Sequence, residues 1–373
     1  MKIAYISPGP IPSESANSIH IIHMCNALAD DIDKLTLYTY SAVKKEDINR
    51  VISEKYGVSI DFQIVKSFNF QKETSIFRLL HGFFSSIKCL YAEHDYIISR
   101  SSWATMFSIL LGLNVIHEEH SPPVHIHNLF LKFIGFKKLH KFVVISENLK
   151  RYIKMKYEKN LSKSKIILLR DAASKKLINI TNNRKKEPNS DLFKVGFSGH
   201  LYKGKGINLI LEVAKRMKKV EFHILGGPDV DVPKLKKSST PNCIFYGNVD
   251  FANVHKILIK FDLLLAPYSK IVSIGKGKMD IGNWMSPLKI FEYMALGKPF
   301  ITSKIEVLEE FLKDGNDAIL AEPDDVDDWI KKIEYMKMNP YLMSEMSKTI
   351  RTKFVKNFTW DQRAKKLLSE ILQ

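Results

Sequence analysis

Short apolar runs alternate with helical patterns along the whole chain, and this alternation constrains the fold more than any other feature. The first series of strand-like runs comprises KIAYIS, KLTLYTY, DYIISR, NVIHEE and KFVVIS. The second series comprises LFKVGFSG, EFHILGG, NCIFYG, FDLLLAPY, PFITS and DAILAEP. Strands that alternate with helices are typical of βαβ units, which build parallel sheets. The sequence therefore predicts an α/β protein.

A polar, basic stretch, KKLINITNNRKKEPNSD, separates the two series. Its composition suits a linker, and 373 residues are enough for two domains that each have a full core. We predict two Rossmann-like domains facing a central cleft. The N-terminal domain is expected over 1–175, the linker over 176–190 and the C-terminal domain over 191–355. A further helix is expected over 356–373, and packing back on the first domain is one arrangement open to it.

Charge and cysteine content limit the partners and the compartment. Lysine and arginine number 57 against 40 acidic residues, a net charge of +17 that favours nucleotide phosphates, nucleic acid or an anionic membrane. The three cysteines form no CxxC pair, which favours a reducing cytoplasm. The N-terminal apolar run is too short for a signal peptide, and no window approaches the roughly 20 apolar residues of a spanning helix. We expect a cytoplasmic protein, with peripheral binding at the inner membrane face as a further option.

The loop after the first predicted strand, SPGPIPSESANSIH, is long and polar. Ser13, Ser15, Asn17 and Ser18 cluster where the first helix begins. A helix N-terminus offers free N–H groups to an anion or a sugar hydroxyl, so the loop is a candidate binding site. An ordinary capped loop is the alternative, and the GxGxxG fingerprint is absent.

The run HEEH follows a predicted buried strand and comprises His117, Glu118, Glu119 and His120. Ligands of open α/β sheets bind at the carboxyl ends of the strands, so the position is functional. The run is not HExxH, and its spacing does not place both histidines on one helical face. We therefore favour a substrate ligand here over a metal site.

The segment FSGHLYKGKGINLI carries glycines and lysines between a strand and a helix. Gly199 allows close approach of the backbone, and Lys203 and Lys205 flank Gly204 just before the helix. Basic side chains and glycines at a helix N-terminus suit a diphosphate. The segment does not match the P-loop pattern, and a solvated basic turn is the alternative.

The stretch SPLKIFEYMALGKPF predicts one complete helix with its own start and stop signals. Ser286 is a good N-cap, Pro287 suits the first helical position and Gly297 supplies the stop. Lys289 and Glu292 lie three positions apart and share a face. They form either a surface ion pair of little energetic value or an anion site with a carboxylate beside it.

These segments, in this order, resemble family 4 of the retaining nucleotide-sugar glycosyltransferases, which have the GT-B fold. The matching segments include LLRDAASKKLI, VGFSGHLYKGKGINLIL, FHILGG, DLLLAPY, SPLKIFEYMALGKPFI and the terminal FTW. The resemblance spans nearly the whole chain. It implies a hexosyltransferase that works without a metal or other cofactor. The implied donor is a UDP- or GDP-linked sugar, the acceptor a glycan or a lipid-linked molecule, and the setting cell-surface polysaccharide biosynthesis.

The resemblance also implies a role for each matching residue. Glu292 matches the second glutamate of a Glu-x7-Glu motif and would bind the donor ribose. Lys205 matches the lysine that neutralises the departing diphosphate, and His120 resembles the N-domain histidine that contacts the donor sugar. These three form the implied catalytic set, with no metal ligand. The implied donor-binding residues are Ser198, Gly199, His200, Lys203, Gly247, Val249, Ser286, Leu288 and Lys289, and the implied acceptor or diphosphate loop contains Ser15, Asn17 and Ser18.

Two positions depart from the family pattern. Trp284 stands where the first glutamate of the motif is expected, and His200 stands where many members have an arginine. These two departures make a catalytically silent, nucleotide-binding GT-B protein one alternative. A sugar-nucleotide epimerase is a second alternative, because that class shares the architecture. Nucleic-acid binding rests on charge alone, and no RRM, KH or helix-turn-helix pattern supports it. The run DVD at 229–231 is expected at the surface rather than at a metal.

Two stretches of the first predicted domain, 67–91 and 129–142, are both basic and aromatic. A basic helix with Phe and Leu on its other face can lie in a membrane interface. The alternative is that the apolar residues face the core and the lysines are merely solvated. We expect these stretches to dock the protein on an anionic inner leaflet, where a lipid-linked acceptor would lie.

Overall fold

The computed structural model describes residues 1–69, 74–123, 125–132, 138–157, 165–182, 192–201, 204–227, 232–272 and 280–373. It divides into two compact units. The first unit contains Met1–Asp171 and Trp360–Gln373, and the second contains Ala172–Thr359. Part of the stretch predicted as a linker, Leu177–Asn182, forms helix α8 of the second unit, and 183–190 lie outside the described residues.

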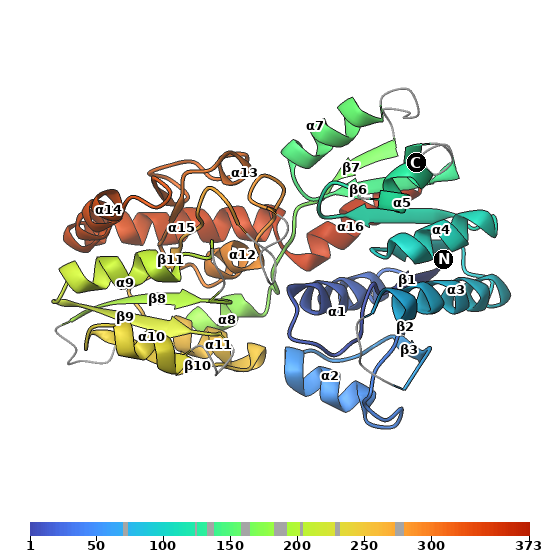
Figure 1. Ribbon diagram of the computed structural model, residues 1–373, viewed down its shortest axis with the longest axis horizontal. Helices are drawn as coiled ribbons and strands as arrows, with labels where there is room; N and C mark the ends of the chain where they lie inside the picture. The colour runs from blue at the N-terminus through green and yellow to red at the C-terminus, as the bar shows by residue number, and fades with distance from the viewer. Residues whose placement is uncertain are drawn as a thin grey trace. The chain divides into compact units, whose positions relative to one another are not determined.

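The first unit is built on a seven-stranded parallel sheet with the order β3-β2-β1-β4-β5-β6-β7 (Figure 1). The register places Ile3 of β1 between Leu35 of β2 and Tyr96 of β4. The chain adds β2 and β3 on one side of β1 and then returns to add β4 on the other side. The elements of this unit are β1 (Lys2–Ile6), α1 (Ala16–Ala29), β2 (Lys34–Thr39), α2 (Ile48–Tyr56), β3 (Gln63–Lys66), α3 (Ser75–Tyr91), β4 (Tyr96–Ser99), α4 (Ser102–Leu110), β5 (Val115–Glu119), α5 (His125–Phe130), β6 (Lys141–Val144), α7 (Glu147–Lys156), β7 (Ile166–Leu168) and α16 (Trp360–Ile371).

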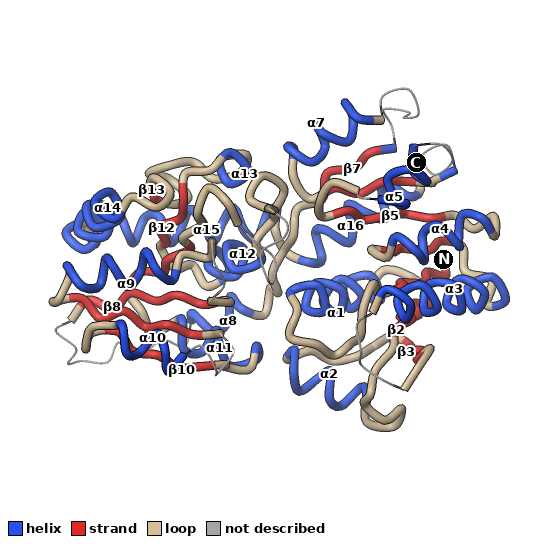
Figure 2. Tube along the Cα trace, in the orientation of Figure 1, coloured by secondary structure: helices blue, strands red, loops and turns tan. Residues whose placement is uncertain are grey.

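The second unit is built on a six-stranded parallel sheet with the order β10-β9-β8-β11-β12-β13 (Figure 2). The strand order reverses between β8 and β11, which are neighbours in the sheet but distant in the sequence. Its elements are α8 (Leu177–Asn182), β8 (Phe193–Ser198), α9 (Ile207–Arg216), β9 (Val220–Leu225), α10 (Val232–Ser238), β10 (Cys243–Gly247), α11 (Phe251–Leu258), β11 (Leu263–Ala266), α12 (Leu288–Ala295), β12 (Phe300–Ser303), α13 (Glu306–Glu309), β13 (Ile319–Ala321), α14 (Val326–Met338) and α15 (Pro340–Asn357).

The predicted fold class and the predicted strands are confirmed, and two strands were missed. Every strand-like run named from the sequence forms a strand of one of the two parallel sheets. The missed strands, β3 and β7, are the two edge strands of the first sheet. They are only four and three residues long, and β3 has no buried residue. An edge strand packs against fewer neighbours, so its apolar pattern is weaker.

The C-terminal helix α16 packs on α1 within the first unit. Its buried side chains recur at helical spacing and include Trp360, Arg363, Ala364 and Leu367. This apolar face, with one arginine in it, explains why the last helix of the chain belongs to the first sheet. Among the described residues, no helix has both the length and the apolar character needed to cross a membrane.

Candidate functional site

Helix α12 is hydrogen-bonded to β8 and β11, the two strands between which the strand order of the second unit reverses. The Tyr293 hydroxyl accepts a hydrogen bond from the backbone N–H of Ser198 at 3.2 Å and donates one to the carbonyl of Leu265 at 3.3 Å. Ser198 ends β8 and Leu265 lies in β11, so one side chain joins both strands to the helix. This reversal is the point at which open α/β sheets bind their ligands.

Glycines allow the loops after these strands to approach one another closely. Gly206 precedes α9 with a φ of 80°, and a Cβ there would lie 2.2 Å from Cγ of Pro267, just after β11. A Cβ at Gly199, just after β8, would lie 2.8 Å from Nζ of Lys289. The end of the Lys289 side chain therefore lies directly against the backbone of Gly199.

Two lysine side chains converge beside this glycine loop. The Nζ atoms of Lys205 and Lys289 lie 5.4 Å and 5.6 Å from the ring centroid of Tyr268, and Lys289 Nζ lies 4.2 Å from that of Phe197. Lys289 Nζ is buried and has no hydrogen-bond partner in the described part of the chain. Burial lowers the pKa of Lys205 to about 8, and burial together with the charge of Lys205 lowers the pKa of Lys289 to about 7. Two desolvated ammonium groups beside aromatic rings can bind an anion.

Glu292 lies one turn after Lys289 on α12 and is buried. Its Oε2 is 3.4 Å from Nε2 of His255, a buried residue of α11. The surface ion pair considered as an alternative for Lys289 and Glu292 is wrong, because the charged ends of both side chains are buried. Cation and carboxylate instead lie inside the unit, next to the end of the central strands.

The start of α12 differs from the prediction. The helix begins at Leu288, and its N-cap is Pro287 rather than Ser286, with no side-chain cap hydrogen bond. Pro287 has φ −78° and ψ 117°, an extended conformation, so it precedes the helix instead of opening it. The first N–H groups of the helix, at Leu288 and Lys289, thus lack intrahelical acceptors. The predicted stop is confirmed, since Gly297 has a φ of 61° after the last turn.

Several predicted donor residues lie at the ends of neighbouring strands. Ser198 Oγ is 3.2 Å from the Tyr293 hydroxyl. Gly247 ends β10, and its carbonyl accepts a hydrogen bond of 2.8 Å from the N–H of Gly226, just after β9. The N–H of Gly199, just after β8, donates a hydrogen bond of 3.0 Å to the carbonyl of Leu225 in β9, so the ends of β8, β9 and β10 lie in one loop cluster. The donor roles of Ser198 and Gly247 stay predictions.

Other predicted positions are less enclosed. His200 is exposed, and Val249 and Trp284 are half-buried. Lys203 and the run at 229–231 lie outside the described residues. Their predicted roles stay predictions.

In the first unit, strand geometry separates the four residues of the HEEH run. Successive side chains of a strand point to opposite faces, so His117 and Glu119 share one face of β5 while Glu118 and His120 share the other. His117 Nε2 lies 3.3 Å from Glu119 Oε2, and His120 Nε2 lies 2.6 Å from Glu118 Oε1. The two histidines belong to two different clusters.

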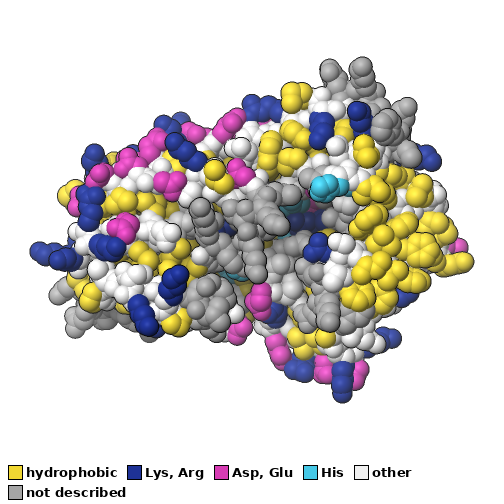
Figure 3. Space-filling model, viewed as in Figure 1, with side chains coloured by type: hydrophobic (Ala, Val, Ile, Leu, Met, Phe, Trp, Pro, Cys, Tyr) yellow, Lys and Arg dark blue, Asp and Glu magenta, His cyan; other side chains and the backbone are white. Residues whose placement is uncertain are grey.

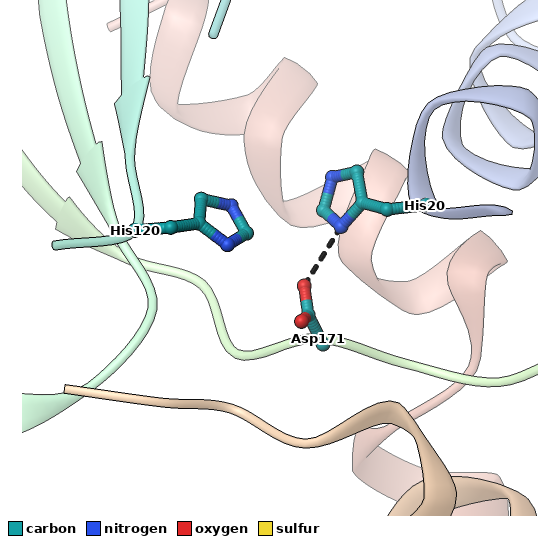
Figure 4. Close-up of side chains that lie close together, drawn as sticks. All are labelled: His20, His120 and Asp171. Carbon is teal, nitrogen blue, oxygen red and sulfur yellow. Dashed lines mark hydrogen bonds and ion pairs between the residues drawn. The ribbon is translucent and has the colours of Figure 1, made fainter. Parts of the chain in front are cut away.

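The first cluster gathers around His20, Glu118, His120 and Asp171. Figure 4 shows His120 from the end of β5, His20 from α1 and Asp171 from the chain after β7 around one centre. His20 Nδ1 lies 2.7 Å from Asp171 Oδ1, and His20 Nε2 lies 3.0 Å from Glu118 Oε1. Arg363 of α16 completes the cluster with a nitrogen 3.0 Å from Glu118 Oε2. Four segments of the first unit are therefore held together by one buried polar network.

The surroundings of Glu118 and His120 determine their protonation states. Burial would raise the pKa of Glu118, but Arg363 and His20 hold it well below its usual range. Burial lowers the pKa of His120 to about 4, and the charge of Arg100 acts in the same direction. At neutral pH Glu118 is a carboxylate and His120 is neutral. His120 then donates its Nε2–H to Glu118, which leaves Nδ1 as a hydrogen-bond acceptor.

The sequence analysis identified His120 but missed His20, Asp171 and Arg363. Asp171 lies inside LLRDAASKKLI, a segment matched to the family without a role for its aspartate. Arg363 occupies an apolar position of the amphipathic C-terminal helix. A charged residue on an apolar face is the signal that could have revealed it, because a buried arginine needs an acceptor.

The loop before α1 forms the predicted helix start. Ser15 is the N-cap, and its side chain accepts a hydrogen bond of 3.3 Å from the N–H of Ser18. Ser13 Oγ and Ser18 Oγ are 2.7 Å apart. Asn17 Oδ1 is buried without a hydrogen-bond partner in the segments that the structure describes. A helix does begin at this serine cluster, and the acceptor or diphosphate role of Ser15, Asn17 and Ser18 stays a prediction.

The comparison with protein families matches residues 193–339 to the family described as Glycosyl transferases group 1. Residues 193–339, which lie within the second unit, are therefore similar to group 1 glycosyl transferases. The resemblance that the sequence indicated is thereby confirmed, and assignment to family 4 stays a prediction. A comparison with curated protein sequences found no match.

Several solved structures share the fold of the whole chain. A glycosyltransferase from Rickettsia africae is 15% identical with a TM-score of 0.75, covering 100% of this chain and 98% of that one. Sucrose-phosphate synthase from Thermosynechococcus elongatus is 15% identical with a TM-score of 0.75, covering 99% and 98%. The Anabaena protein HepE, in complex with UDP and glucose, is 12% identical with a TM-score of 0.72, covering 100% of both chains. The fold is therefore GT-B.

Proposed function

We propose that this protein is a retaining glycosyltransferase that moves a sugar from a nucleotide donor to a glycan or lipid-linked acceptor in cell-surface polysaccharide biosynthesis. The observation that carries the proposal is the pair of buried ammonium groups, Lys205 and Lys289, beside Glu292 at the strand reversal of the second unit. A departing nucleoside diphosphate is an anion that buried cations and a helix N-terminus stabilise. In this proposal Glu292 binds the donor ribose.

The comparisons support a nucleotide-sugar donor for this site. Residues 193–339, which match the transferase family, include both lysines and Glu292. The Anabaena protein HepE has been crystallised with UDP and with UDP-glucose. We propose a UDP- or GDP-linked donor, with no divalent metal or other cofactor in the transfer step.

His120 is proposed to contact the donor sugar. Its neutral ring donates to Glu118 at 2.6 Å, so the tautomer with a free Nδ1 lone pair is favoured. An acceptor nitrogen of this kind can receive a hydrogen bond from a sugar hydroxyl. Arg363 acts on His120 through Glu118, and the ring of His20 contacts that of His120 edge-on with centroids 5.4 Å apart, so both are positioning residues.

Calorimetric titration with UDP, GDP and ADP tests the anion site. Glu292→Gln and Lys289→Met are expected to weaken binding of the preferred nucleotide by about 10- to 150-fold each, the range for losing a hydrogen bond to a charged group. Glu212 and Lys215 offer a matched control, since they form an exposed ion pair of 2.7 Å on α9 of the same unit. Glu212→Gln and Lys215→Met should leave the affinity unchanged. Equal affinities for all four variants and the parent protein would refute the assigned site.

Product analysis then separates the enzyme classes. A transferase consumes the nucleotide sugar only when an acceptor is present and releases the nucleoside diphosphate. An epimerase converts the donor without an acceptor, and a silent protein binds nucleotide without turnover. The anomeric configuration of the product, read by NMR, decides whether transfer is retaining.

We further propose that the first unit docks on an anionic membrane through α3 and α4. In α3 the buried face is small and polar, with His81, Gly82, Ser85, Ser86 and Cys89, so the large apolar side chains face outward. Figure 3 shows hydrophobic side chains gathered over these helices. The exposed ones are Ile76, Phe83, Phe84, Leu90, Tyr91, Leu110 and Leu111.

The chemistry of this surface favours a lipid bilayer as the occupant. Phe83 lies against Phe84 and Phe107 with ring centroids 5.4 Å and 5.3 Å apart, which forms an aromatic ridge. The charged residues of α3, Arg78 and Lys88, are both basic and exposed, and α4 has no charged residue. Aromatic side chains flanked by basic ones bind an anionic interface.

Flotation with vesicles tests this surface. The protein is expected to float with vesicles that contain anionic lipid at low salt, and Phe83→Ser with Phe84→Ser should reduce the floated fraction several-fold. Met338→Ser with Tyr341→Ser removes two exposed apolar side chains from the second unit and serves as the control. Absence of binding in the parent protein, or an equal loss in both double variants, would refute this docking surface.

A further inference from the structure

A second polar cluster of the first unit lies on the opposite face of β5 and joins His117, Glu119 and His127. His117 Nε2 lies 3.3 Å from Glu119 Oε2, and His127 Nδ1 of α5 lies 3.6 Å from the same oxygen. One ligand-type atom from each residue lies within 4.8 Å of the other two. His117 and His127 are buried, and the Glu119 side chain is 16% exposed.

The carboxylate of this cluster has no strong cation beside it. In the described part of the chain, the ion-pair partners of Glu119 are the imidazoles of His117 and His127. Its other oxygen, Oε1, accepts a hydrogen bond of 3.3 Å from the N–H of His120. Glu118, on the opposite face, instead has Arg363 at 3.0 Å. Burial of a carboxylate without a cationic partner destabilises the fold. Glu118 has such a partner in Arg363 and, among the described residues, Glu119 does not, so a bound cation would stabilise the Glu119 cluster.

One histidine nitrogen of the cluster is also unsatisfied. His127 Nε2 is buried and has no hydrogen-bond partner among the described residues, while its Nδ1 lies 3.0 Å from Ser102 Oγ. The ring of His117 stands edge-on to that of His127 with centroids 4.9 Å apart. The His127 nitrogen that faces Glu119 is Nδ1, and the unpaired Nε2 is the other nitrogen of the same ring, so the cluster combines an uncompensated carboxylate with a buried imidazole that is only partly satisfied.

We propose that His117, Glu119 and His127 form a zinc site. Two imidazoles and a carboxylate are a ligand set that zinc favours, with a fourth position left for water. With zinc–nitrogen bonds of about 2.0–2.1 Å, two tetrahedral ligand atoms lie about 3.3–3.4 Å apart. The observed separations from Glu119 Oε2, 3.3 Å and 3.6 Å, need only a small contraction. This site is separate from the transfer chemistry and does not rest on the proposed function.

The neighbouring hydroxyls suit a metal site. Thr105 Oγ1 lies 2.7 Å from His117 Nδ1, so it orients the ring with Nε2 toward the cluster, as outer-shell partners do in zinc sites. Ser102 bonds to the His127 nitrogen that faces Glu119 and would release it when the ion binds. The ion would tie α5 to the end of β5, one position before His120.

The other cluster that could hold a metal is a poorer candidate. His20, His120 and Asp171 also bring ligand-type atoms within 4.8 Å. However, Arg363 lies within 3.0 Å of the Glu118 carboxylate that both histidines of this cluster face. A fixed guanidinium there supplies the positive charge and repels a second cation.

Titration of the metal-free protein with Co²⁺ and Zn²⁺ tests the proposal. We expect one ion per chain, the visible absorption of tetrahedral cobalt, and its displacement by zinc. His117→Gln, Glu119→Gln and His127→Gln should each weaken zinc binding by about 100-fold or more, since loss of an outer-shell partner alone costs 10- to 100-fold. Thr105→Val keeps all three ligands and should weaken binding by about 10- to 100-fold. Ser102→Ala should keep the parent affinity.

The chain offers a matched control on another strand. Glu221 and His223 of β9 also lie two positions apart, with His223 Nε2 3.2 Å from Glu221 Oε2, but within the described ranges no second histidine joins them. Glu221→Gln with His223→Gln should leave stoichiometry and affinity unchanged. Absence of tetrahedral cobalt absorption in the parent protein would overturn the proposal, and so would parent affinity in Glu119→Gln. If Asp171→Asn lost the ion and Thr105→Val kept the parent affinity, the ion would be bound by the His20, His120 and Asp171 cluster. That result would also overturn the assignment.

Discussion

Nucleoside diphosphate binding is expected to take up protons, because the two lysines of the anion site are partly neutral in the free protein. The pKa of Lys289 is lowered to about 7 and that of Lys205 to about 8, both chiefly by burial. A diphosphate beside them favours the ammonium form and returns each pKa toward its ordinary value near 10.4. The affinity must therefore fall as the pH rises through the pKa values of the free protein.

The size of the effect follows from these two values. At pH 8 Lys289 is about 90% neutral and Lys205 about 50% neutral, so binding takes up about 1.4 protons. Binding requires each lysine to be protonated, so its neutral fraction raises the dissociation constant. Between pH 7 and 9 this factor rises about 50-fold for Lys289 and about tenfold for Lys205. The dissociation constant should increase by about 500-fold over this range. Lys289→Met should retain only the dependence on Lys205, about tenfold, with an uptake of about 0.5 protons at pH 8.

Calorimetry in two buffers with different ionisation enthalpies measures the proton uptake directly at pH 8. The terminal phosphate of the ligand ionises near pH 6, so it contributes little between pH 8 and 9. Lys215→Met, in the exposed control pair, should keep the uptake of the parent protein. An uptake near zero in the parent protein, with a flat dissociation constant from pH 7 to 9, would refute the placement of the diphosphate on these lysines.

Three further substitutions test the energetics of the two units. Lys289→Met should raise the melting temperature of the free protein by a few degrees, because it removes a desolvated ammonium. This increase in melting temperature should become smaller from pH 7 to 9. The parent protein itself becomes more stable over that range, because the pKa of Lys289 is lower in the folded than in the unfolded state. Arg363→Ala leaves the Glu118 carboxylate buried without its cation and should lower the free energy of unfolding, measured in urea, by about 3–5 kcal/mol. A stability equal to that of the parent protein would show that the ion pair does not stabilise the fold. Gly206→Ala places a Cβ 2.2 Å from Pro267 at a φ of 80° and should cost about 1–3 kcal/mol, with weaker nucleotide binding. Parent stability in this last variant would mean that the loop after β11 moves freely.

The fold was predictable because parallel sheets bury their strands on both faces. Runs such as LLLAPY and KIAYIS are apolar at almost every position, and β11 and most of β1 are fully buried. The edge strands β3 and β7 lack this signal because they are short and partly covered. The start of α12 was misplaced by one residue, since Ser286 and Pro287 carry the composition of a cap but Pro287 adopts an extended conformation.

The candidate site was predictable where its residues lie close together in the sequence. Lys289 and Glu292 share one helical turn, and their spacing alone placed them together. The partners of His120 come from the first helix, from the chain after β7 and from the last helix, so no local pattern could join them. The second face of β5 was missed for the opposite reason. HEEH was considered as one unit, whereas the period of two in a strand sends its residues to two clusters.

Glu118 in the first unit and Lys289 in the second unit are buried charges with opposite surroundings, and this difference indicates where a ligand enters the transfer chemistry. In the first unit Glu118 has Arg363 and two histidines around it, so its cluster is complete and holds His120 in one tautomer. In the second unit the Lys289 ammonium is buried without a hydrogen-bond partner in the described residues, and burial shifts its pKa toward neutrality. A compensated cluster gains little from an added ion, whereas an uncompensated cation is stabilised by an anion that arrives from outside. The charge balance therefore assigns anion binding to Lys289 and orientation to Glu118, independently of the family match.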